Sequence, residues 1–156
     1  MKTLLVTTGW SHVLATLGTL PQVELHTLDC GSFPYSRKEF RSQLGTVFGV
    51  SPIELLITYR CPYIVPTDFL SKAVQGLNIH PSLLPEGKGL NPWEEILSRR
   101  RNSCGVTIHQ LTEHVDEGEV LLREPCPLSF ADTLETAREK TDRLAARMIQ
   151  RLLPTL

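Results

Sequence analysis

The sequence predicts an α/β domain with a mainly parallel central sheet. Short runs rich in β-branched residues alternate along the chain with longer stretches of helical period, and this alternation is typical of βα units. The length of 156 residues suits one domain with a hydrophobic core. An apolar fraction of 41% and a charged fraction of 21% are ordinary for a globular protein. We therefore expect a single domain over residues 1–156.

The chain up to residue 58 predicts three strands separated by two helices. Strands are expected over residues 2–7, 23–28 and 53–58, each a short apolar or β-branched run. Helices are expected over the two intervening stretches, 11–20 and 36–48. The second helix begins with a serine three residues before a glutamate (SRKE), the spacing of a capping box.

The middle of the chain predicts a helix, a very short strand and a loop. The helix is expected over residues 67–75, because Gly76 is a good C-terminal stop. The chain then re-enters the sheet at Leu77. Pro81 ends this strand, because proline has no N–H to donate to a ladder. The following stretch HPSLLPEGKGLNP is rich in proline and glycine and predicts a loop.

A short helix and two strands are expected after this loop. Asn91 can cap a helix that has Pro92 at its first position and runs to three arginines at 99–101. Strands are expected over residues 105–110 and 118–123, with the polar turn LTEHVDE between them.

The final helix is expected to pack against the sheet. Asp132 and Glu135 have the spacing of a capping box at its start. Apolar residues then recur at helical period, which predicts one buried face. The residues of this face are Leu134, Ala137, Leu144, Ala145, Met148, Ile149 and Leu152.

Charge and hydropathy exclude several classes of partner. A formal net charge of -1 lacks the positive excess that non-specific nucleic-acid binding needs. No apolar run approaches the roughly 20 residues of a membrane span, and the N-terminus MKTLLVTTGW lacks a signal-peptide pattern. We therefore expect a cytoplasmic protein that binds neither nucleic acid nor membranes.

The cysteines and histidines predict neither a metal site nor a redox pair. The four cysteines lie far apart without a CxxC motif, and the five histidines lack the HExxH spacing. We expect free thiols and no metal.

Asn78 and His80 are the residues best placed for chemistry. Residues two apart on a strand share a face, so these two side chains point the same way while Ile79 points to the other. They stand at the carboxyl end of a presumed parallel strand, the edge at which open α/β sheets bind ligands. An amide that can hold an oxyanion, beside an imidazole that can move protons, is suited to acyl transfer.

Asp116 is the candidate third member of this site. It lies in the polar turn between two predicted strands, and it could orient or charge the imidazole if the hairpin folds back over the strand that carries His80. A histidine near a strand end is more often a satisfied structural residue than a catalyst, so a structural role stays open at this point.

Three ordered motifs resemble the signature of the folate-dependent formyltransferase family, which includes glycinamide ribonucleotide and methionyl-tRNA formyltransferases. They are LNIHPSLLP with the later Gly89, then GVTIHQ, then HVDEGEVLL. Asp116 follows Asn78 by 38 positions, as the family pattern of about forty residues implies. The resemblance covers residues 53–133, roughly half of the chain.

The resemblance implies a Rossmann-like three-layer sandwich, a single catalytic domain over residues 1–156. It would transfer a formyl group from 10-formyltetrahydrofolate to an amine. By matching position, Asn78 would stabilise the tetrahedral intermediate, His80 would handle the proton and help to stabilise the oxyanion, and Asp116 would orient His80 or a bound water.

The resemblance also implies ligand contacts around this site. The folate would lie along two segments and be held largely through backbone groups, with the acceptor amine on a third group of residues. The cofactor contacts would be Cys61, Pro62, Tyr63, Ile64, Thr112, His114 and Val115. The substrate contacts would be Gly9, Ser82 and Gly89.

The acceptor is expected to be a small amine. The loop after the first strand reads TTGWSH, with one glycine where glycinamide ribonucleotide enzymes have a glycine-rich phosphate cradle, and its tryptophan would crowd a phosphate. The chain ends soon after its last predicted helix and has near-zero net charge, so we expect no tRNA substrate.

Two alternatives remain open from the sequence. The chain could be a formyltetrahydrofolate hydrolase, or a catalytically degenerate relative that only binds folate. An apolar face of the first or last predicted helix could also form a homodimer, and the sequence does not decide this.

Overall fold

The computed structural model describes residues 1–31, 36–50, 52–89, 92–98 and 103–156. Its strands are β1 (Lys2–Thr7), β2 (Glu24–Asp29), β3 (Ile53–Tyr59), β4 (Ala73–His80), β5 (Ser103–Gln110) and β6 (Val120–Pro127). Its helices are α1 (His12–Thr19), α2 (Arg37–Val50), α3 (Thr67–Leu70), α4 (Pro92–Ser98), α5 (Leu134–Leu152) and the 3-10 helix η1 (Leu153–Thr155).

The strands form one six-stranded sheet in the order β2-β1-β3-β4-β5-β6. The four strands from β2 to β4 are parallel, and β5 and β6 add as an antiparallel hairpin. β1 lies between β2 and β3, so the chain crosses to the other side of β1 after β2. The prediction of a mainly parallel central sheet is confirmed.

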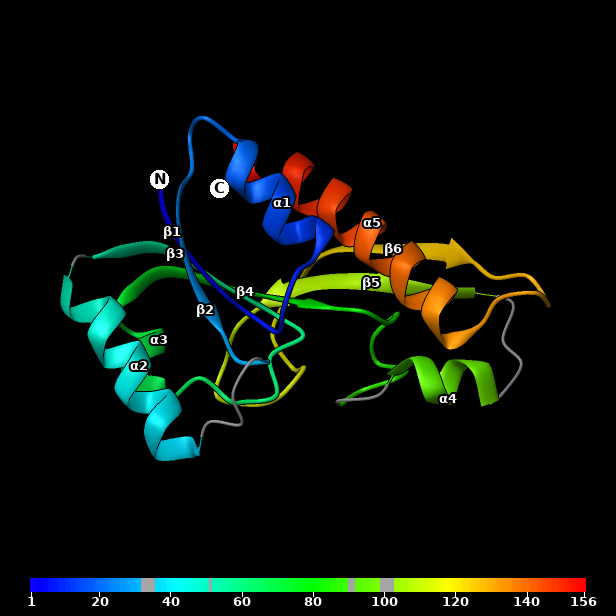
Figure 1. Cartoon of the computed structure of the whole chain (residues 1–156), viewed down its shortest axis with the longest axis horizontal. Coiled ribbons are helices and arrows are strands. Elements are labelled where there is room, and N and C mark those ends of the chain that lie inside the picture. Colours follow the sequence, from blue (N-terminus) through cyan, green and yellow to red (C-terminus); the bar gives the residue numbers. More distant parts are fainter. Residues whose placement is uncertain (32–35, 51, 90–91, 99–102) are drawn as a thin grey trace.

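Helices cover both faces of the sheet and make the three layers that were expected (Figure 1). On one face, α1 and α5 pack on the central strands around a core that includes Leu17, Ile57 and Met148. On the other face, α2 and α3 pack on β1 and β3 around Phe40 and Leu56. The buried face of α5 follows the predicted helical period.

The predicted helix over residues 67–75 is wrong in length. The helix ends at Leu70, and β4 begins at Ala73, where the first half of the strand pairs in parallel with β3. Strand pairing and burial outweigh the weak local helical preference. Gly76 is therefore a strand residue rather than a helix stop, and a Cβ there would lie 3.1 Å from Leu111 Cβ.

Helix caps agree only in part with the predicted capping boxes. The box of Ser36 and Glu39 is confirmed, since each donates its backbone N–H to the other's side chain, at 2.7 and 3.2 Å. The box of α5 consists of Thr133 and Thr136. Asp132 instead accepts from Ser129, before the helix. The predicted cap Asn91 and the arginines at 99–101 lie outside the described residues.

The predicted strand over residues 118–123 is shifted toward the C-terminus. β6 spans Val120–Pro127 and leaves Gly118 in the preceding turn. Among the described residues, no helix is long and apolar enough to cross a membrane.

Candidate active site

A cavity of about 570 Å³ lies at the carboxyl ends of the parallel strands. Thr8 follows β1, Arg60 follows β3, and His80 ends β4, and all three line the cavity. Ile79 packs in the core beneath α1 and α5, while the side chains of its neighbours Asn78 and His80 both contact Asp116 at the cavity. The predicted alternation along this strand is therefore confirmed, and Pro81 turns the chain away after it.

Three hydrogen bonds fix the orientation of the Asn78 amide. Thr58 donates its hydroxyl to Asn78 Oδ1 at 2.8 Å. Asn78 Nδ2 lies 3.0 Å from His109 Nε2 and donates to Asp116 Oδ1 at 3.3 Å. A flipped amide would place its oxygen against the Asp116 carboxylate, so the network admits one orientation. The N–H groups of Asn78 therefore point into the site.

His80 is held by an acceptor on each side of its ring. Its Nε2 lies 2.7 Å from the carbonyl oxygen of Gly87, and its Nδ1 lies 3.4 Å from Asp116 Oδ1. The Gly87 carbonyl oxygen is the nearer of the two acceptors, so neutral His80 carries its proton on Nε2 and has its lone pair on Nδ1. Burial lowers the pKa of His80, and the neighbouring Asp116 carboxylate and Gly87 carbonyl oppose that shift without cancelling it.

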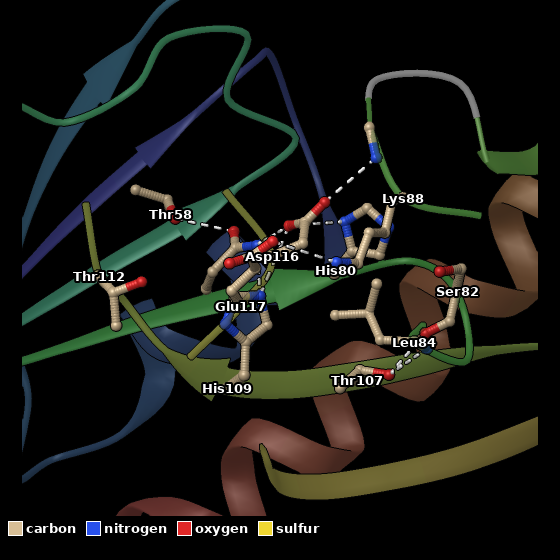
Figure 2. A network of polar contacts seen from close by, with 12 residues as sticks. Thr58, His80, Ser82, Leu84, Lys88, Thr107, His109, Thr112, Asp116 and Glu117 are labelled. Carbon is tan, nitrogen blue, oxygen red and sulfur yellow. Dashed lines mark hydrogen bonds and ion pairs between the residues drawn. The ribbon is translucent and has the colours of Figure 1, made fainter. Parts of the chain in front are cut away.

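Asp116 lies between His80 and His109 (Figure 2), and it accepts a hydrogen bond from Asn78. Its Oδ1 faces both imidazoles, and its Oδ2 accepts from the Gly89 N–H at 3.1 Å. Burial acts to raise the pKa of Asp116, but contacts with the two imidazoles and the Gly89 N–H outweigh it, so the pKa is lowered. Asp116 is therefore a buried carboxylate, with its side chain 4% exposed.

The turn that carries Asp116 needs the glycine that follows it. Asp116 has φ 57, a left-handed conformation that aspartate tolerates better than most residues. A Cβ on Gly118 would lie 1.8 Å from the carbonyl oxygen of Gln110. The DEG sequence thus brings the turn against the end of β5 and holds the carboxylate over β4.

The loop after β4 completes the site through its backbone. Gly87 and Gly89 both have positive φ, 63 and 95, which glycine adopts without cost. Gly87 presents its carbonyl to His80, and Gly89 presents its N–H to Asp116. An ion pair of 3.5 Å between Lys88 and Glu117 joins this loop to the turn (Figure 2).

His109 belongs to the site and was not predicted as a member. It pairs across the antiparallel ladder with Asn78, and its ring is 2% exposed. Its Nδ1 donates to the carbonyl oxygen of Gln110 at 2.9 Å, so its Nε2 is free to accept from Asn78. The strand period of GVTIHQ places His109 on the face of Thr107, but only the pairing of β5 with β4 brings it to Asn78.

All the residues predicted as cofactor contacts line the cavity. Two of them, Ile64 and Val115, are large apolar side chains that are 61% and 52% exposed. Arg138 and Trp93 also line the cavity and were not predicted, with the guanidinium 5.1 Å from the ring centre.

Of the three residues predicted to contact the substrate, one lines the cavity and two do not. Gly89 lines it. The side chain of Ser82 is fully buried and donates to the Glu86 carbonyl at 2.5 Å. Gly9 donates its N–H to Asp29, and its neighbour Thr8 lines the cavity instead.

Comparison with known proteins finds one matching family model and curated relatives of two kinds. The formyl transferase family model matches residues 22–153. Methionyl-tRNA formyltransferase of Ehrlichia ruminantium is 33% identical over 146 residues, which are 93% of this chain and 47% of that protein. The trifunctional purine biosynthetic protein adenosine-3 of Gallus gallus is 36% identical over 106 residues, 67% of this chain and 11% of that protein. The chain thus spans less than half the length of these curated relatives.

Solved structures show the same fold. Phosphoribosylglycinamide formyltransferase from Anaplasma phagocytophilum has a TM-score of 0.78 at 19% identity, covering 96% of this chain and 83% of that one. A sugar N-formyltransferase from Shewanella sp FDAARGOS_354 has a TM-score of 0.76 at 19% identity, covering 98% and 68%. The expected Rossmann-like fold is confirmed. On the match of the family model to most of its length, the chain belongs to the formyl transferase family.

Proposed function

We propose that this chain transfers a formyl group from 10-formyltetrahydrofolate to a small amine. The observation that carries the proposal is the contact of one buried carboxylate, Asp116, with both Asn78 and His80 at the wall of a large cavity. An amide donor can stabilise an oxyanion, and an imidazole beside a carboxylate can accept and return a proton, so these groups are suited to formyl transfer to an amine.

The cavity is suited to a folate donor. Its volume of about 570 Å³ lies within the usual range of small-molecule sites. The exposed apolar side chains of Ile64 and Val115 at its wall can cover the flat face of a pterin ring. The segments that contain these two residues, 60–65 and most of 111–116, also line the cavity.

The proton passes through Nδ1 of His80. The amine nitrogen attacks the formyl carbon, a C–N bond forms, and the carbonyl electron pair moves to oxygen. The neutral imidazole takes the proton of the attacking nitrogen on Nδ1, because Nε2 is already bonded to Gly87. The resulting imidazolium faces Asp116, which stabilises its charge. The oxyanion then re-forms the carbonyl group as the C–N10 bond breaks, and N10 of the folate takes the proton from His80.

Asn78 stabilises the oxyanion in this step. Its N–H groups point into the site, and the one that contacts Asp116 makes the longest of its hydrogen bonds, 3.3 Å. Asp116 is also a negatively charged acceptor, but charge-assisted hydrogen bonds are strongest at about 2.7 to 2.9 Å, so an oxyanion at that range accepts better than Asp116 does at 3.3 Å. The amide therefore exchanges that contact for the oxyanion and keeps its orientation through Thr58 and His109.

The start of α1 is not suited to bind a phosphate group of the acceptor. Backbone N–H groups at a helix N-terminus commonly bind phosphate. Here the N–H of His12 donates to the carboxylate of Asp142 at 2.9 Å, and Leu14 donates to Ser11 at 3.0 Å. Glu139, 2.9 Å from the His12 ring, adds a second carboxylate. These groups repel an anion, which supports a small amine other than a ribonucleotide.

Folate binding is testable without turnover. We expect saturating 5-formyltetrahydrofolate, a non-reactive analogue, to raise the thermal unfolding midpoint by about 5 to 10 °C at 100 times its dissociation constant. The reason is that only the folded chain has the cavity. Differential scanning fluorimetry at increasing ligand concentration measures the shift.

A matched pair of variants locates the bound folate. Ile64→Glu places a charge at the cavity wall. It is expected to abolish most of the rise in the unfolding midpoint that 5-formyltetrahydrofolate causes. Val74→Glu makes the same change at a residue that is 85% exposed and does not line the cavity, and it should leave the shift intact. Wild-type protein that shows no shift with any reduced folate would rule out a folate function.

A further inference from the structure

Cys104 and Cys126 lie directly opposite each other in the β5–β6 hairpin. They are register partners across the antiparallel ladder, although 21 residues separate them in sequence. Opposed residues in such a ladder have Cα atoms about 4.5 to 5.5 Å apart. Disulfides form over Cα separations of about 4.4 to 6.8 Å. The backbone therefore already holds the two cysteines at bonding separation.

The two side chains also lie on the same face of the hairpin. Opposed residues of an antiparallel pair point to one side of the sheet. Cys104 alternates with Val106 and Ile108, which are buried in the core beneath α5, and Cys126 packs against that same core. The Cys104 thiol lies 3.5 Å from the backbone carbonyl oxygen of Cys126. The two sulfur atoms therefore share one space between the sheet and the helix.

The two thiols differ in their access to solvent. Cys104 is 1% exposed, whereas Cys126 is half-buried on the outer strand. Burial and the adjacent Cys126 raise the pKa of Cys104 to about 12. The pKa of Lys140 is raised, mainly by its ion pair with Asp132 at 2.7 Å and to a smaller extent by the two nearby cysteines.

We propose that Cys104 and Cys126 are a redox modification site, at which a small-molecule disulfide oxidises them to a reversible intramolecular disulfide. The bond would link β5 to β6 covalently. The residues between the two cysteines, which include Asp116, would then lie within a closed covalent loop. This inference does not depend on the proposed function.

The chemistry proceeds by two exchanges. The Cys126 thiolate attacks one sulfur of a disulfide such as glutathione disulfide, which forms a mixed disulfide and releases one glutathione thiolate. The Cys104 thiolate then attacks the Cys126 sulfur and releases the second glutathione thiolate. The two cysteines lose two electrons and two protons, and glutathione disulfide becomes two glutathione thiols.

Peptide mapping of the full chain tests the pairing. Reduced protein is equilibrated with glutathione buffers of increasing oxidised fraction, alkylated, and digested with trypsin without reduction. Cleavage at Arg123 places the two cysteines on different peptides. We expect a linked pair of peptides from monomeric protein that disappears on treatment with dithiothreitol. Recovery of the two cysteines as separately alkylated peptides in every buffer would overturn the proposal.

Single variants test the order of attack. Cys104→Ala is expected to accumulate glutathione on Cys126, because the second thiol is missing. Cys126→Ser is expected to give no linked peptide and no glutathione on Cys104, which is buried. A linkage found only between two chains, as a dimer on a non-reducing gel, would contradict the intramolecular bond.

Discussion

Replacing His80 with alanine is expected to lower the rate of formyl transfer at least about 100-fold, the usual scale for losing a general acid or base. The variant loses the lone pair on Nδ1 that takes the proton from the attacking amine. Another imidazole, that of His109, also lies beside Asp116 and Asn78. His109 cannot substitute, because its Nδ1 donates to the Gln110 carbonyl and its Nε2 faces Asn78. The measurement is the steady-state rate with a saturating amine.

The matched control is His26→Ala. His26 lies on β2, has a side chain that is 39% exposed, and does not line the cavity, so this variant should retain wild-type rates. Folding and folate binding by His80→Ala are checked by the thermal shift with 5-formyltetrahydrofolate, which should remain. A His80→Ala rate within tenfold of wild type would exclude His80 as the proton acceptor.

Replacing Asp116 with asparagine is expected to lower the rate by about 100-fold or more. The imidazolium formed during transfer loses its partner charge. Because the site is buried and has a low dielectric constant, this loss raises the free energy of the imidazolium strongly. The substitution preserves shape, and asparagine accepts the positive φ of this position as readily as aspartate. The substitution should therefore lower kcat and leave the affinity for folate unchanged.

The pH profile distinguishes this role from a structural one. Proton transfer needs neutral His80, so the wild-type rate should rise with pH about a midpoint below the ordinary histidine value of about 6.5, because burial lowers this pKa. Asp116 opposes that lowering, so in Asp116→Asn the midpoint should move to still lower pH. Asp68→Asn, which alters an exposed carboxylate paired with Arg41, should leave rate and midpoint unchanged. An identical midpoint in Asp116→Asn would contradict the coupling.

The residues proposed for chemistry could be named from the sequence because local patterns record them. A strand of period two that ends at a proline places Asn78 and His80 on one face. The glycine after Asp116 marks a tight turn, which a Cβ on Gly118 would prevent. Resemblance to a family then supplied the spacing that joins the two motifs, and the structure shows the three side chains in contact.

The parts that were missed depend on contacts distant in sequence. The first half of β4 was predicted as helix because its pairing with β3 leaves no local trace. His109 could be assigned to the site only from the antiparallel pairing of β5 with β4, which places it opposite Asn78. Gly87 and Gly89 act through backbone atoms, and such atoms carry no side-chain identity to read. The pairing of Cys104 with Cys126 likewise comes from strand register.

The fate of the formyl carbon tests formyl transfer at this site most directly. The protein is incubated with 10-formyltetrahydrofolate labelled with ¹³C in the formyl group, together with a panel of amino sugars, amino acids and ribonucleotide amines. NMR then follows the labelled carbon. We expect the label to move from N10 to the nitrogen of one amine, to do so only when that amine is present, and to remain on the folate with His80→Ala. Label that appears as formate without any amine, or that stays on the folate with every amine tested, would contradict formyl transfer.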